Sequence, residues 1–178
     1  TPDLPPGPPL EALPLPVEVS VPLRCAARGC TAHTELKPDA QLASVLQAHP
    51  VQCLLNVKVY QTDYDGLEGT AELLEFVRVA GSTLAVDVAP GRNPCRAAWA
   101  GGPLPEEERL FTVLGGQDVT AAFAAGNLTV QAKITPAVDE CAHDGFLLDG
   151  FAELRCDLRA AGVAPAAPAV DVPREAPA

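Results

Sequence analysis

Apolar and polar residues alternate along much of this chain with a period of two rather than 3.6. The clearest case is 128–134, where every second residue is apolar. Such alternation is typical of strands that bury one face. Similar patterns predict further strands at 17–23, 55–59, 73–79, 83–88, 109–114 and 146–156. Seven or eight short strands, separated by turn signals, indicate an all-β fold: an antiparallel β-sandwich.

Proline and glycine refine this prediction at three places. Pro22 lies inside the first strand and cannot donate a ladder hydrogen bond, so this strand is expected at a sheet edge. Gly81 and Ser82 lie between two predicted strands and indicate a short hairpin. Gly150 interrupts the last strand and predicts a bulge or a bend there.

Two short helices are expected between the strands. Asp39 can cap a helix over 41–48, because its carboxylate can accept a hydrogen bond from the first turn. Asp118 can cap a second helix over 119–125 in the same way. Gly126 then stands where a helix C-terminus favours a left-handed residue.

Proline is dense at both ends of the chain. We expect 1–16 to be an extended proline-rich linker and 161–178 to be a Pro/Ala-rich linker, around one module at 17–160. Disordered tails are the alternative interpretation. A chain that starts at Thr1 without methionine also indicates a mature or excised piece of a longer secreted precursor.

Composition limits the function classes. The net charge is −11, which disfavours binding to nucleic acid or to an anionic membrane surface. No run of apolar residues is long enough to predict membrane insertion. Hydrophobic residues make up 48% of the chain but aromatic residues only 4%, so the core volume must come mainly from valine and leucine. Disulfides would usefully supplement such a core.

Two features predict an extracellular location. The chain has six cysteines, and the triplet Asn127-Leu128-Thr129 is an N-glycosylation signal on the polar side of its predicted strand. We therefore expect a secreted glycoprotein with Asn127 as the glycan acceptor. The cysteines expected to form disulfides are Cys25, Cys30, Cys53, Cys95, Cys141 and Cys156.

The six cysteines allow fifteen pairings. We prefer Cys53–Cys156, because the start of one strand could meet the end of an antiparallel neighbour. Cys95–Cys141 would then join two loops and leave Cys25–Cys30 as a local bridge. A zinc site at Cys25, Cys30 and His33 is the alternative, but extracellular thiolates oxidise.

Three segments of the chain resemble a known class of module. They are GQDVTAAFAAGNLTVQAKI at 116–134, the stretch from Asn56 to Cys95, and VDECAHDGFLLDGFAELRC at 138–156. Together they resemble galactose-binding-like jelly-roll modules of large secreted glycoproteins of algae and other protists, of the mastigoneme or cell-wall type. The resemblance implies a jelly-roll sandwich with a structural or carbohydrate-related role, and it implies no catalytic residues.

An acidic stretch is the candidate metal site. Asp63, Asp65 and Glu68 alternate with other residues in a predicted loop, and calcium prefers such carboxylate oxygens. The spacing does not match an EF-hand, and a solvated acidic loop is the alternative. Calcium is therefore the one cofactor considered, and no other is expected.

Candidate ligand-binding and catalytic residues are few. Trp99 and Tyr64 could stack on a sugar, although packing within the protein is the alternative for Trp99. Asp139, Glu140 and Asp144 could in principle supply a glycosidase acid and base, but no apolar setting is evident to raise one pKa. We expect no enzyme.

The sequence thus predicts a non-catalytic structural or assembly module of a secreted glycoprotein, such as a fibre, cell wall or surface coat. Its partners would be neighbouring copies or modules of a larger extracellular assembly. The alternative is a carbohydrate-binding module, with calcium as an aid.

Overall fold

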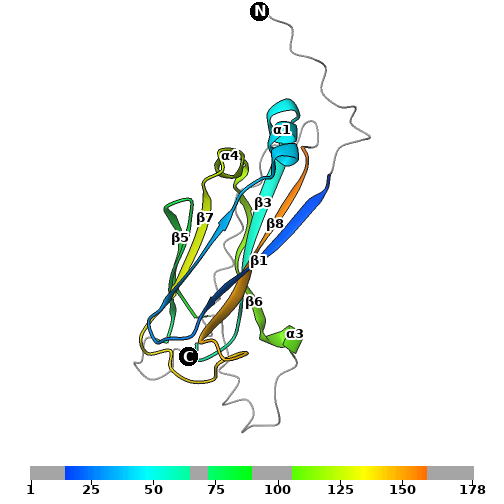
Figure 1. The fold of residues 1–178 in the computed structure, drawn as a ribbon. Helices are drawn as coiled ribbons and strands as arrows, with labels where there is room; N and C mark the ends of the chain where they lie inside the picture. The colour runs from blue at the N-terminus through cyan, green and yellow to red at the C-terminus, as the bar shows by residue number, and fades with distance from the viewer. Residues whose placement is uncertain (1–14, 65–71, 90–105, 160–178) are drawn as a thin grey trace, which may run out of the picture.

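The strands form two antiparallel sheets of four (Figure 1). The computed structural model describes residues 15–64, 72–89 and 106–159. Its strands are β1 Val17–Cys25, β2 Thr31–Leu36, β3 Val51–Tyr60, β4 Leu74–Val79, β5 Ser82–Val88, β6 Leu110–Asp118, β7 Leu128–Ile134 and β8 Leu148–Leu158. Its helices are α1 Ala40–Ala48, α3 Glu106–Arg109 and α4 Thr120–Ala124. The sandwich lies within the predicted module at 17–160, and most of both predicted linkers lies outside the described residues.

The strand order is that of a jelly roll. One sheet has the order β1-β8-β3-β6 and the other β2-β7-β4-β5. The chain therefore behaves as a long nested hairpin, in which β4 pairs with β5, β3 with β6, β2 with β7 and β1 with β8. Folding that hairpin over itself places alternate pairs in opposite sheets. The predicted all-β, jelly-roll-like sandwich is confirmed.

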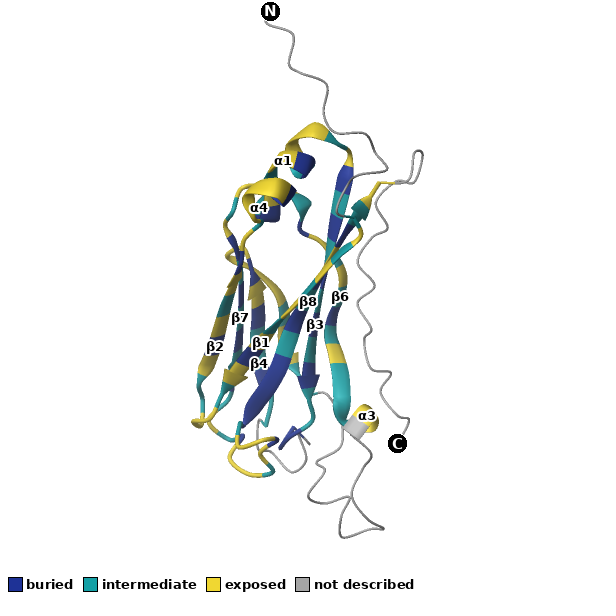
Figure 2. Ribbon diagram, turned by 45° about the vertical axis from the view of Figure 1, so that its right-hand side comes forward, coloured by how far each residue is buried: buried dark blue, intermediate teal, exposed yellow. Residues whose placement is uncertain are grey.

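The core lies between the two sheets and is mostly aliphatic. Along β3 and β7 every second side chain is buried, as the alternating sequence predicts. Figure 2 shows buried residues running along β8 and β3. Tyr64 and Phe123 are the largest fully buried side chains, and the others of that group are leucine, isoleucine and valine. Valine and leucine thus fill most of the core, as the low aromatic content requires.

The predicted bulge at Gly150 is absent from the structure. The pairings of Gly150 with Leu23 on one side and with Val59 on the other continue the regular register, so it forms no bulge. A Cβ atom at this position would instead meet the carbonyl oxygen of Lys58. Glycine is needed here because two backbones approach closely.

Gly150→Ala is expected to lower the free energy of unfolding by about 2 kcal/mol, the usual cost of overpacking. The matched control is Gly115→Ala in β6, whose added Cβ would meet Thr112 Cγ2 at an ordinary 3.5 Å. Urea denaturation measures both variants. Equal losses in the two would contradict the close approach.

Both helices predicted between the strands are present. Asp39 Oδ1 accepts a hydrogen bond from the Leu42 amide at 2.8 Å, which confirms Asp39 as the cap of α1, and the helix begins at Ala40, one residue earlier than predicted. Helix α4 begins at Thr120 rather than at 119. Its N-cap residue is Val119 and no side chain caps it, so the predicted cap by Asp118 is wrong. Asp118 instead accepts hydrogen bonds from the Thr120 amide at 3.0 Å and from the Thr120 hydroxyl at 2.7 Å. Burial alone would raise the pKa of Asp118, but these bonds and one from Gln52 outweigh it and leave that pKa lowered. Gly126 has φ +71°, as expected after the helix.

Two of the preferred disulfides are confirmed. Cys53 and Cys156 face each other on the paired strands β3 and β8 and are fully buried. Cys25 and Cys30 close the turn between β1 and β2, which excludes the alternative zinc site. Cys141 is also disulfide-bonded, whereas Cys95, its predicted partner, lies outside the described residues.

Candidate functional site

The jelly-roll topology gathers four connections at one end of the sandwich. The connections β1–β2, β3–β4, β5–β6 and β7–β8 all start and finish there, at the end opposite α1 and α4 (Figure 1). The predicted acidic stretch, Trp99 and the acidic group around Cys141 all belong to these connections. The described residues among them, Asp63 and the acidic group around Cys141, therefore lie at one end of the molecule.

This end also holds the buried polar residues. Among the described residues, the buried polar or charged ones are Thr62, Asp63, His143 and Asp149. Asp149 is fully buried at the start of β8. A buried carboxylate is costly unless it is paired, so its partners define the site.

Both oxygens of Asp149 are paired. Arg24 on β1 lies opposite Asp149 in the strand register, and its Nε donates to Oδ1 at 2.6 Å. His143 Nδ1 lies 2.6 Å from Oδ2. Asp149 thus joins strand β1 to the connection that precedes β8.

That connection folds back over the outer face of the sheet. The backbones of His143 and Phe146 exchange hydrogen bonds of 3.0 and 2.8 Å. The His143 ring stacks on Tyr60 of β3, with centroids 3.9 Å apart and planes 10° apart. The guanidinium of Arg24 lies 5.1 Å from the centre of the Phe146 ring. Stacking and hydrogen bonding together fix the orientation of the His143 ring.

Thr62 and Tyr64 tie the β3–β4 connection to the same place. The Thr62 hydroxyl donates to the Leu147 carbonyl at 2.8 Å, and the Tyr64 hydroxyl donates to that oxygen at 3.4 Å. Tyr64 is fully buried, and burial raises the pKa of its phenol despite the side-chain hydrogen bond with Thr62. Its ring is therefore part of the packed interior in this structure.

The residues predicted for calcium and for sugar binding are only partly described. Asp63 is buried, whereas Asp65, Glu68 and Trp99 lie outside the described residues. The calcium site and the role of Trp99 stay predictions.

The second acidic group does not act as one unit. Asp139 forms an ion pair of 2.6 Å with Arg28 in the β1–β2 turn. Glu140 and Asp144 are exposed. Of the acidic group, only Asp144 lies close to the buried pair of His143 and Asp149, with its carboxylate within 4.8 Å of their ligand atoms.

Sequence reasoning missed Arg24, Tyr60 and Asp149. Each lies on a strand at a position that alternation assigns to the outer face. Asp149 is buried only because the 135–147 connection covers it, and nothing local in the sequence signals that cover.

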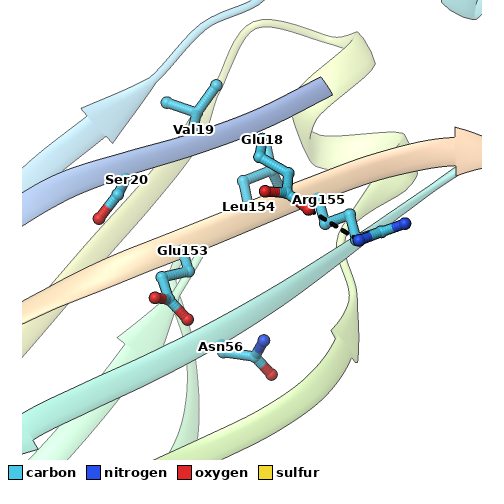
Figure 3. A pocket seen from close by; sticks show the side chains of 7 residues that line it. All are labelled: Glu18, Val19, Ser20, Asn56, Glu153, Leu154 and Arg155. Carbon is cyan, nitrogen blue, oxygen red and sulfur yellow. Dashed lines mark hydrogen bonds and ion pairs between the residues drawn. The ribbon is translucent and has the colours of Figure 1, made fainter. Parts of the chain in front are cut away.

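A shallow hollow of about 240 Å³ lies further along the same outer face, over β1, β8 and β3 (Figure 3). Its charged residues are paired: Arg155 contacts Glu18 at 2.7 Å, and Glu153 contacts Lys58 at 2.7 Å. Asn56 accepts a hydrogen bond from the Gly116 amide at 2.8 Å. These interactions are those of a solvated sheet face.

The predicted glycan acceptor is accessible. Asn127 is exposed just before β7, and Thr129 is half-buried. Both border a hollow of about 220 Å³ that Glu35 and Lys37 also line. A hydrogen bond and the charge of Lys37 lower the pKa of Glu35.

No family model, curated protein or solved structure matches this chain. The resemblance to secreted glycoprotein modules therefore stays a prediction. None of the helices in the described ranges is long and apolar enough to cross a membrane.

Proposed function

We propose that this chain is a non-catalytic extracellular module that assembles with further copies of itself. The disulfides support an oxidising compartment. The exposed position of Asn127 supports its use as a glycan acceptor. The assembly role is supported mainly by strand β5, an edge strand with exposed apolar side chains.

Strand β5 is the outermost strand of its sheet (Figure 1). It carries exposed apolar side chains. Val86 is 61% exposed and Leu84 is 37% exposed. The only other large hydrophobic side chain exposed in the described residues is Leu158, at the end of β8. An edge strand with apolar side chains favours contact with another protein chain.

Charge supports a second copy as the partner. At a net charge of −11, two copies repel one another, so they must meet where acidic side chains are few. Strand β5 contains a single acid, Asp87. Arg78 on the neighbouring strand contacts the Thr83 hydroxyl at 3.1 Å and offers an opposite charge for Asp87 of the other copy.

The contact is expected to be short. The register between β4 and β5 shifts between Val77 and Arg78, and Asp87 has φ +50°. Such irregularities shorten the edge that another strand can pair with. This favours reversible contacts between neighbouring modules rather than an extended continuous sheet.

Sedimentation equilibrium of the purified chain over a range of concentrations tests the proposal. We expect reversible self-association, weakened at least about tenfold by Val86→Lys because a charge replaces an apolar contact. The matched control is Leu158→Lys, which changes the exposed apolar residue outside β5. A monomer at every concentration, or an equal effect of both substitutions, would contradict the proposal.

Carbohydrate binding remains the second prediction from the sequence. Of the two aromatic residues named for it, Tyr64 is fully buried and Trp99 lies outside the described residues.

A further inference from the structure

We propose that His143, Asp144 and Asp149 form a binding site for a divalent cation of the zinc type. Each offers one ligand atom, and the three atoms lie within 4.8 Å of one another. In the described part of the chain, this is the only group of three such residues. The site shares no residue with the acidic stretch predicted to bind calcium.

The spacing suits a small ion. Zinc binds imidazole nitrogen and carboxylate oxygen at about 2.0–2.2 Å, so two ligands of a tetrahedral ion lie about 3.3 Å apart. His143 Nδ1 and Asp149 Oδ2 lie 2.6 Å apart, and they already point at each other. An ion would replace the hydrogen between them after these two atoms separate by less than about 1 Å.

The third ligand completes an open site. Asp144 follows His143 directly and is exposed, so its carboxylate can approach from the solvent side. Three protein ligands leave the fourth position of a tetrahedral ion to water. The site thus has two buried ligands, His143 and Asp149, and one exposed ligand, Asp144. An ion can therefore enter it from solvent.

Neighbouring groups fix the two buried ligands in place. Arg24 Nε holds the other oxygen of Asp149, and the Tyr60 ring stacks on His143. Outer partners of this kind orient metal ligands and raise their affinity. The guanidinium opposes a cation, but its side chain is 42% exposed and therefore screened by solvent. The two carboxylates outweigh it and leave the site with one net negative charge.

The ligand atoms of the site, one imidazole nitrogen and two carboxylate oxygens, favour zinc over calcium. Imidazole with carboxylate suits zinc, whereas calcium takes six to eight oxygen ligands. A bound ion would hold the 135–147 connection on the outer face of the sheet. It would therefore stabilise the folded state by an amount that rises with the logarithm of the free zinc concentration.

Isothermal titration calorimetry with zinc chloride, together with thermal denaturation, tests the site. We expect one bound ion per chain and an unfolding midpoint that rises with zinc concentration. Asp144→Asn removes an exposed ligand without disturbing the buried pair, and we expect it to weaken affinity at least about tenfold. Calcium chloride should leave the midpoint unchanged at concentrations where zinc raises it.

The matched control is His33→Ala, since His33 is exposed on β2 of the other sheet. It should bind zinc as the unmodified chain does. An absence of zinc binding, unchanged affinity in Asp144→Asn, or loss of binding in His33→Ala would each overturn the proposal. The titration is run at concentrations where the chain is monomeric, so its outcome is independent of self-association.

Discussion

Removing the disulfide between Cys53 and Cys156, by changing both residues to alanine, is expected to lower the free energy of unfolding by about 4–5 kcal/mol. The bond links residues 103 positions apart, so it strongly restricts the unfolded chain. Both sulfurs are fully buried between adjacent strands, and their loss would also leave space in the core. Equilibrium denaturation in urea, at one low protein concentration, measures the change.

The short disulfide is the matched control. Cys25 and Cys30 are only 5 positions apart, and the same entropy relation gives about 2 kcal/mol for their removal. The long bridge should therefore cost about twice as much as the short one. Equal losses would contradict the view that the long bridge acts mainly by restricting the unfolded chain.

Asp149→Ala is expected to lower the free energy of unfolding by about 3 kcal/mol. The substitution leaves Arg24 and the buried His143 without their shared acceptor, and a buried group that loses its partner is costly. Partial exposure of Arg24 keeps the loss near the lower end of the range known for buried pairs.

The matched control for Asp149→Ala is Asp157→Ala. Asp157 lies on the same strand, but its ion pair with Arg155 is exposed, and such pairs contribute at most about 1 kcal/mol. Denaturation in urea should show a change below about 0.5 kcal/mol for Asp157→Ala. Similar losses in the two variants would contradict a special role for the buried Asp149.

The strands could largely be predicted because most of them bury one face. Alternation places β3, β7 and the inward face of β1 directly. It failed for β2, which contributes few large apolar residues: its buried positions are Ala32 and Leu36. The jelly-roll topology came from a resemblance, and the observed strand order agrees with it.

The candidate site could not be predicted because its burial is not local. Arg24, Tyr60 and Asp149 stand at outward positions of three different strands, and alternation assigns such positions to solvent. Only the return of the 135–147 connection over the sheet brings His143 onto them. Gly150 shows the same limit, because the need for glycine comes from the Lys58 carbonyl of a neighbouring strand.

The proposal that copies meet through β5 is tested most directly by hydrogen exchange at two protein concentrations. At the high concentration, where copies associate, amides of residues 82–88 should exchange more slowly than at the low concentration. Amides of β2, the opposite edge of the same sheet, should exchange equally at both. Unchanged exchange in 82–88, or slowing confined to another part of the chain, would contradict the proposed assembly surface.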